Sequence, residues 1–324
     1  MIRFSRSAGG RERSSAWAWM PTPLPRIRQG AEGSLPRAVH GKVTTVYVIL
    51  ALSSAILLGL WKFGIGQFRG RISNYSVVLV SASSAAVVYL FLGFTTGGLA
   101  FDRWDAYRGL IGGAFNVAGT ILVLKAFERG KLGVVTGVAS ASTLVPLAYS
   151  VLAGEPVSRL AACGIVVILV GLLTFYVPNM KAEAGASNSK AAIAMAAAAA
   201  LSWGVAIVVI DIGSRVSVTG TMFMSQLPQI AFTLIMVVVV TDSLRGLTGL
   251  PLAAIAGAGL ALALGNVAFF TAANEGNIGV VSVIGSLSPI VVALLALAIL
   301  GEQMVRSERL ALLIVLAGTC LVVS

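Results

Sequence analysis

Two charged side chains stand out because each comes directly after a long apolar run. Lys62 follows one run and Asp211 follows another, and the shift of 149 residues that places Ser53 on Ser202 also places Lys62 on Asp211. A cation and an acid at equivalent positions would bind the opposite charges of a zwitterionic ligand, or Asp211 would exchange a proton. The alternative is that each residue only ends its helix, with the lysine reaching back to the membrane surface.

Uncharged polar and aromatic side chains inside the apolar runs form a second set of candidates. Where no water is present, amides and hydroxyls either join neighbouring helices, at about 1 kcal/mol each, or contact a ligand. Pro228 and Pro289 each remove a backbone hydrogen bond from a helix and free a carbonyl group for a ligand. The candidate ligand-binding residues are Asn116, Ser142, Trp203, Gln226, Asn266, Phe270, Ser286, Ser288 and Pro289, with Ser140 and Gln229 beside them.

The composition places the chain in a membrane. It is 57% hydrophobic and only 11% charged, whereas a soluble globular protein carries about a quarter charged residues. The net charge of +11 does not indicate nucleic acid, because 8 of the 23 basic residues precede Val43. One histidine and two cysteines, Cys163 and Cys320, are too few to build a metal site or a disulfide framework. We therefore expect a lipid bilayer around the protein, and no nucleic acid, metal or cofactor bound to it.

Ten apolar runs have the character of bilayer-crossing helices, which are about 17 to 25 residues long. They lack the short, strictly alternating pattern of β-barrel strands, so the predicted fold class is an all-α integral membrane protein with ten transmembrane helices. Residues 1–42 are rich in Arg, Ser, Gly and Pro, which predicts a disordered basic tail or a transit peptide. The ten runs are 43–60, 77–94, 109–124, 132–152, 160–177, 191–210, 221–240, 250–273, 278–300 and 310–323.

The chain contains a duplication. The segments Gly119–Glu155 and Gly265–Glu302 share an apolar helix, an elbow and a second helix that ends at Gly-Glu, at a shift of 146 to 147 residues. The most polar linker of the body, residues 178–190, lies where the two copies join. Each copy, 43–177 and 191–324, holds five helices, and an odd number reverses the second copy in the membrane. We therefore expect two inverted five-helix repeats.

These motifs resemble the drug/metabolite transporter superfamily, in its ten-helix EamA-type branch. The fourth helix of each repeat in that branch ends in a small-residue, proline-containing run that stops at Gly-Glu. The motif is Ser286–Pro289 with Gly301-Glu302 here, and more loosely Ser140–Pro146 with Gly154-Glu155. Residues Ala200–Gly204 resemble the family's opening helix, which the first copy does not reproduce. The resemblance implies secondary transport of a small organic molecule by alternating access, commonly export of amino acids or other metabolites, without fixing the substrate.

Other functions stay open on the sequence alone. A sugar-phosphate or nucleotide-sugar exchanger would need more basic residues deep in its helices than Lys62 and Lys125. An intramembrane enzyme would need clustered acids, His or Cys at one face, and the acids here are dispersed among loops. A non-transporting sensor or scaffold would need a soluble module, which the sequence does not suggest. Transport is therefore the leading hypothesis, and we do not expect an enzyme.

Two features near the helix ends have structural interpretations. Glu155 and Glu302 each follow a helix-ending glycine, and we expect them to form ion pairs with Arg159 and Arg306 rather than a catalytic carboxylate pair. The small residues of Gly133–Gly137 are typical of close helix packing, within one chain or in a homodimer. The expected location is the inner cell membrane, or an organellar membrane if the tail is a transit peptide. The distribution of basic residues does not fix the orientation.

Overall fold

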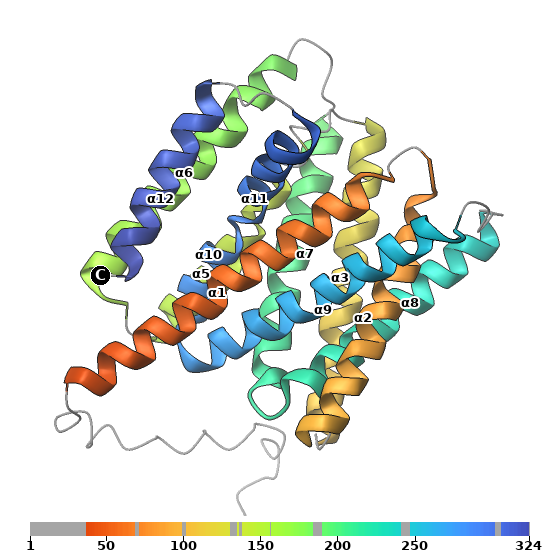
Figure 1. Ribbon diagram of the computed structural model, residues 1–324, viewed down its shortest axis with the longest axis horizontal. Coiled ribbons are helices and arrows are strands. Elements are labelled where there is room, and N and C mark those ends of the chain that lie inside the picture. The colour runs from red at the N-terminus through yellow and green to blue at the C-terminus, as the bar shows by residue number, and fades with distance from the viewer. Residues whose placement is uncertain are drawn as a thin grey trace, which may run out of the picture. The chain divides into compact units, whose positions relative to one another are not determined.

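Figure 1 shows the computed structural model of the chain. The structure describes residues 37–68, 71–98, 102–129, 135, 138–155, 157–183, 190–240, 247–301 and 306–323. Residues from Lys42 onward form one compact unit. The prediction of a disordered tail falls mostly outside the described residues. The first helix, α1 (Arg37–Gly66), begins before the predicted start at Val43.

Every element that these residues form is a helix or a helical turn, as the apolar runs predict. The first half of the chain holds α1, α2 (Asn74–Thr96), α3 (Arg103–Arg129), the 3-10 turn η1 (Ser140–Thr143), α5 (Leu144–Leu152) and α6 (Arg159–Glu183). The second half holds α7 (Lys190–Ser214), α8 (Val218–Val239), α9 (Leu250–Glu275), α10 (Ile278–Gly285), α11 (Ser288–Leu295), the π-helical turn η2 (Ala296–Leu300) and α12 (Arg306–Val323).

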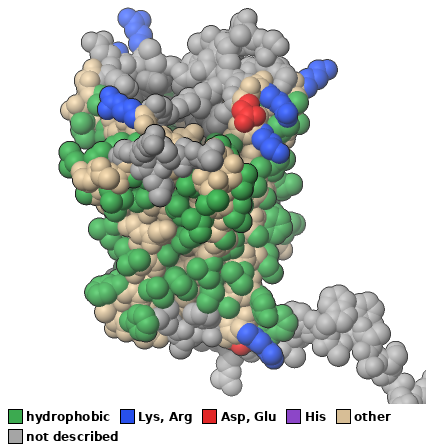
Figure 2. Space-filling view, turned by 90° about the vertical axis from the view of Figure 1, so that its right-hand side faces the viewer, with side chains coloured by type: hydrophobic (Ala, Val, Ile, Leu, Met, Phe, Trp, Pro, Cys, Tyr) green, Lys and Arg blue, Asp and Glu red, His purple; other side chains and the backbone are tan. Residues whose placement is uncertain are grey.

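The helices have the length and surface of a protein that crosses a membrane several times. Seven described segments are long and apolar enough to span a bilayer, and they coincide with seven of the predicted runs. Three shorter apolar helices, Ser140–Leu152, Arg159–Thr174 and Arg309–Val322, fall on the other three runs. Figure 2 shows a hydrophobic surface between an upper end, where Lys and Arg side chains gather, and a lower end with less basic surface. The protein is therefore an integral, multi-pass membrane protein.

The predicted helix break at Pro289 is confirmed. Helix α10 ends at Gly285, and α11 begins at Ser288 with Pro289 in its first turn. Proline is favoured there because its ring fixes φ and the first turn needs no N–H donor. Beyond α11, the π-helical turn η2 ends at Gly301, whose φ of 68° is left-handed and suits glycine. In the first half, η1 takes the place of the break between α10 and α11, and α5 also stops before a left-handed glycine, Gly154.

Close packing of helices depends on glycines whose missing side chain lets two backbones meet. Helix α3 packs against α7 and α8, α2 packs against α8 and α9, and α6 lies beside α12 (Figure 1). Gly113 on α3 sits directly on the backbone of Ser225 on α8, and Gly259 on α9 sits on the backbone of Ser81 on α2. A Cβ at either glycine would overlap that backbone, so these crossings require glycine.

A second pair of glycines joins the first helix of each half to the broken helix of the other half. A Cβ on Gly204 of α7 would lie 2.7 Å from the backbone oxygen of Ser142. A Cβ on Gly59 of α1 would lie 3.1 Å from the backbone oxygen of Ser288. Both helix breaks are therefore packed against a glycine from the opposite half of the chain.

Candidate functional site

The break between α10 and α11 receives a charged side chain from the other half of the chain. The Nζ of Lys62, on α1, donates a hydrogen bond to the Oγ of Ser288 at 2.7 Å. Ser288 is 1% exposed and lies near the middle of the candidate span Ile278–Leu300, whereas Lys62 is exposed. The ammonium therefore reaches the mid-depth of the broken helix.

Backbone groups at this break are only partly satisfied. Ser286 and Leu287 turn the chain, with their N–H groups bonded to the carbonyls of Ser282 and Ile284, both at 3.0 Å. The Ser286 Oγ donates to the Val283 carbonyl at 2.6 Å. Pro289 has no N–H to offer to the carbonyl of Gly285, four residues earlier, so this carbonyl loses its usual helical donor. The break thus combines an ammonium donor with a buried backbone acceptor that lacks its usual helical donor.

No carboxylate pairs with Lys62 among the described residues. The three ion pairs within the described residues involve Arg108 with Asp105, Arg215 with Glu155, and Arg215 with Asp211. A charged group inside a membrane normally pairs with an opposite charge or marks the path of a charged ligand. Among the described residues, the hydrogen-bond partner of Lys62 is the neutral hydroxyl of Ser288, and no carboxylate balances its charge.

Amide side chains flank the crossing of α3 and α8. Asn116 lies one helical turn beyond Gly113 on α3, and Gln226 and Gln229 lie within about one turn of Ser225 on α8. Within the described part of the chain, these three amides take part in no side-chain hydrogen bond to another side chain. Gln226 and Gln229 are 6% and 7% exposed, on either side of Pro228. They have both the depth and the free hydrogen-bonding capacity of ligand-binding groups.

Other predicted site residues have structural partners instead. The Nε1 of Trp203 donates to the backbone oxygen of Asn116 at 3.1 Å, and its ring covers Gly119, so this tryptophan joins α7 to α3. Asn266 donates to the hydroxyl of the fully buried Tyr89 at 3.1 Å. Phe270 is 4% exposed and packs edge-on against Phe269. The sequence alone had not indicated these partners, and the binding role expected of the three residues stays a prediction.

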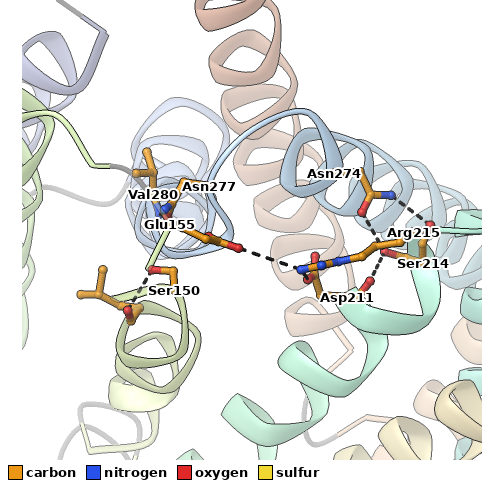
Figure 3. A network of polar contacts seen from close by, with 9 residues as sticks. Ser150, Glu155, Asp211, Ser214, Arg215, Asn274, Asn277 and Val280 are labelled. Atoms are coloured by element: carbon orange, nitrogen blue, oxygen red, sulfur yellow. Dashed lines mark hydrogen bonds and ion pairs between the residues drawn. The ribbon is translucent and has the colours of Figure 1, made fainter. Parts of the chain in front are cut away.

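Asp211 belongs to a separate network, shown in Figure 3. Its Oδ2 lies 3.3 Å from the Nη2 of Arg215, which also lies 3.9 Å from the Oε1 of Glu155 (Figure 3). Lys62 and Asp211 therefore engage different partners. The expectation that Glu155 pairs with Arg159 is wrong, because the turn after α7 brings Arg215 to it and Arg159 is exposed. Glu302 lies outside the described residues, so its pairing with Arg306 stays a prediction.

Helix ends from three segments hold this network in place. Asn274, near the end of α9, donates to the backbone oxygen of Ser214 at 2.9 Å, and Ser214 precedes Arg215 at the end of α7. Asn277 caps α10 by accepting a hydrogen bond from Val280 N–H at 3.0 Å. The carboxylate of Glu155 accepts a hydrogen bond from the backbone of Ile278. Arg215 and Asn274 follow their apolar runs like ordinary helix-end residues, so sequence reasoning missed them.

Burial raises the pKa of Glu155 above its usual value. Its side chain is 24% exposed, so desolvation disfavours the charged form, and the nearby negative charge of Asp211 adds to this effect. The Arg215 guanidinium and the hydrogen bond from Ile278 lower the pKa but do not cancel the increase. Glu155 is thus easier to protonate than an exposed glutamate.

Comparisons with known proteins agree with this architecture. Residues 190–324 match the model of the EamA-like transporter family. One solved crystal structure aligns over 85% of this chain and 96% of its own, with a TM-score of 0.71 and 17% sequence identity, which establishes a shared fold. No curated protein matches the sequence. Residues 190–324 are therefore similar to the EamA-like transporter family, as the motifs of the sequence predict.

Proposed function

We propose that this protein is a secondary transporter that exports amino acids or related small metabolites by alternating access between two five-helix repeats. The family match and the multi-pass helical fold support a membrane transporter of the drug/metabolite type. The observation that carries the substrate class is the Lys62 ammonium at the helix break, which has no carboxylate partner among the described residues. A substrate carboxylate would complete that pair.

The inverted repeats are supported by contacts that occur twice with the halves exchanged. Gly113 meets Ser225, and Gly259, which is 146 residues after Gly113, meets Ser81 in the other half. Gly171 on α6 likewise meets Val315 on α12, while Gly318 meets Ile168. Gly318 comes 147 residues after Gly171, and Ile168 comes 147 residues before Val315. The same contact thus occurs twice with the two halves exchanged, as expected for halves related by a two-fold axis. Two equivalent halves of this kind can rock around a central site.

Lys62 gives the site an asymmetric charge. Gly59 and Gly204 make equivalent contacts to Ser288 and Ser142, and they are 145 residues apart. This shift of 145 residues differs by about one helical turn from the shift of 149 residues that aligns Lys62 with Asp211. It places the apolar Ile207 opposite Lys62. A single cation at the centre favours the carboxylate of a small metabolite, with the amides of Asn116 and Gln226 available for its polar groups.

A phosphate exchanger is less well supported. A phosphate group carries more charge than a carboxylate and is usually held by several cations or by bidentate arginine. The described basic residues near helix ends, such as Arg108 and Arg215, already have carboxylate partners. Lys62 alone suits a monoanion.

Export by intact cells tests this function. Metabolites that accumulate outside cells expressing the wild type would be compared with those outside empty cells and cells expressing Lys62→Met, at matched membrane levels. We expect carboxylate-bearing compounds to accumulate only with the wild type. Lys190→Met, which changes an exposed lysine at the start of α7, serves as the control and should behave like the wild type. Equal accumulation in all four strains would contradict the proposal.

A further inference from the structure

Glu155 and Asp211 share one guanidinium. The Arg215 Nη2 lies 3.9 Å from Glu155 and 3.3 Å from Asp211. Two ionised carboxylates against one cation leave the cluster with one excess negative charge. A partly buried cluster with this imbalance favours uptake of a positive charge.

Each carboxylate also has an oxygen that finds no donor. Among the described residues, Glu155 Oε2 and Asp211 Oδ1 are buried without a hydrogen-bond partner, and the Asp211 side chain is only 2% exposed. The Nδ2 of Asn277, in a residue that is 9% exposed, is likewise unpartnered and lies beside Glu155 in Figure 3. Buried polar atoms without partners are costly, so the cluster as it stands is incomplete.

We propose that Glu155 and Asp211 together bind one proton, which the transporter uses as its coupling ion. This inference rests on the proposed transport function. The proton adds to Glu155 Oε2 or Asp211 Oδ1 without breaking a covalent bond, and it cancels the excess charge. The resulting O–H supplies the donor that the buried oxygens lack.

The exposed fractions of the Arg215, Glu155 and Asp211 side chains indicate the order in which a proton would reach the two carboxylates. Arg215 is 44% exposed, Glu155 is 24% exposed and Asp211 is 2% exposed. Glu155 therefore meets water first, and Asp211 is the inner acceptor. A metal cation would need a shell of oxygen ligands, whereas the other groups beside Glu155 are donors, namely the Ile278 N–H and the Asn277 amide.

No other charge in the described surroundings competes for this role. Helices α8 and α10 carry no ionisable side chain. Arg159 on α6 and Glu275 on α9 are exposed and form no ion pair among the described residues. On α3, Arg108 and Asp105 pair with each other at 2.8 Å. Arg215 is therefore the cation that sets the charge state of the cluster.

Proton binding is linked to movement because the cluster joins the two halves. Glu155 follows α5 in the first half, whereas Asp211 lies in the last turn of α7, and Arg215 follows α7, in the second half. A proton on Glu155 removes the charge that attracts Arg215, which weakens this tie between the halves. Because the pKa of Glu155 is raised by burial, this change occurs at a higher pH than it would for an exposed glutamate.

Infrared difference titration of the purified protein in liposomes tests the proton site without any substrate. We expect a protonated-carboxyl band whose midpoint lies above the value of 4.5 for an ordinary glutamate. Glu155→Gln and Asp211→Asn each remove the excess negative charge, so either variant should lower the midpoint of the band or abolish the band, whereas Arg215→Gln should raise the midpoint. Glu275→Gln, an exposed carboxyl at the end of α9, is the control and should leave the band unchanged.

The titration can overturn the proton site, and its failure can be distinguished from a failure of the transport function. The absence of the band, or its persistence at an unchanged midpoint in Glu155→Gln and Asp211→Asn alike, would overturn the proton site. Loss of the band on adding sodium, but not choline, would assign the site to a sodium ion and also overturn the proposal. A wild-type band in a protein that exports nothing would contradict the transport function and leave the proton site standing.

Discussion

The Nζ of Lys62 lies 2.7 Å from the Oγ of Ser288, which comes 226 residues later in the chain. This hydrogen bond ties the first helix of one half to the broken helix of the other half. It also brings a cation to the helix break, where Pro289 has no N–H to donate to the carbonyl four residues earlier. The two residues therefore form the contact on which the proposed substrate site depends.

Removing the charge of Lys62 should impair transport more than removing its partner. A hydrogen bond to a charged group contributes about 1.5 to 3 kcal/mol, so Lys62→Met should reduce transport roughly ten- to a hundredfold. Ser288→Ala removes only a neutral hydroxyl and should reduce it several-fold. Initial rates of efflux at matched protein levels measure both effects. A Ser288→Ala variant weaker than Lys62→Met would contradict this order.

The glycine at the α3–α8 crossing should be essential for stability. Gly113→Ala places a methyl group on the backbone of Ser225, and overpacking of this kind costs about 1 to 3 kcal/mol. The melting temperature in detergent should therefore fall by several degrees. Gly257→Ala on α9 is the matched control, because its Cβ would meet no atom within 4 Å. That variant should keep or slightly raise the melting temperature, since alanine favours helix; equal melting of the two variants would argue against the close crossing.

Stability should depend on pH through Glu155. Its folded-state pKa is raised, so the folded protein binds a proton more tightly than the unfolded chain does between the ordinary and the raised pKa. The unfolding free energy should therefore decrease as the pH rises through that window, and Glu155→Gln should flatten this dependence. Thermal melts of both proteins across a mildly acidic pH series measure the difference. A wild type that gains stability with rising pH in this window would contradict the raised pKa.

The ion pair between Glu155 and Arg215 should contribute only modestly to stability. Both side chains are partly exposed and their atoms are 3.9 Å apart, so a coupling energy of about 0.2 to 1 kcal/mol is expected. A double-mutant cycle with Glu155→Gln, Arg215→Gln and the double variant isolates this energy. A coupling of zero would show that Arg215 serves Asp211 alone. Arg159→Gln, combined with Glu155→Gln in the same way, should show no coupling.

Much of the helical fold could be predicted because lipid imposes strong rules on sequence. The runs of apolar residues predicted the helix positions, and Pro289 with Gly301 predicted where the broken helix is interrupted and where it ends. The start of α1 was placed too late because the basic residues before Val43 do not look apolar. Backbone hydrogen bonding continues a helix past such residues, so hydropathy alone misses its first turns.

The site was harder to predict because side-chain partners depend on how helices cross. The hydrogen bond from Lys62 to Ser288 joins two residues that both attracted attention, yet nothing in their spacing indicated contact. Trp203 looked like a ligand-facing aromatic, but the glycine at position 119 gives its ring a place on α3. The pairing of Glu155 with Arg215 could not be predicted, because Arg159 is much nearer to Glu155 in the sequence. In the structure, the turn after α7 brings Arg215 to Glu155 instead.

The central claim, that the protein moves carboxylate-bearing metabolites past Lys62, is tested most directly in liposomes. Purified wild-type protein and the Lys62→Met variant would be reconstituted into vesicles loaded with a mixture of the twenty amino acids, and the compounds released would be measured over time. We predict that the wild type releases some of the twenty amino acids and that Lys62→Met releases the same amino acids at least about tenfold more slowly. Release of these amino acids at equal rates by both proteins would contradict this claim.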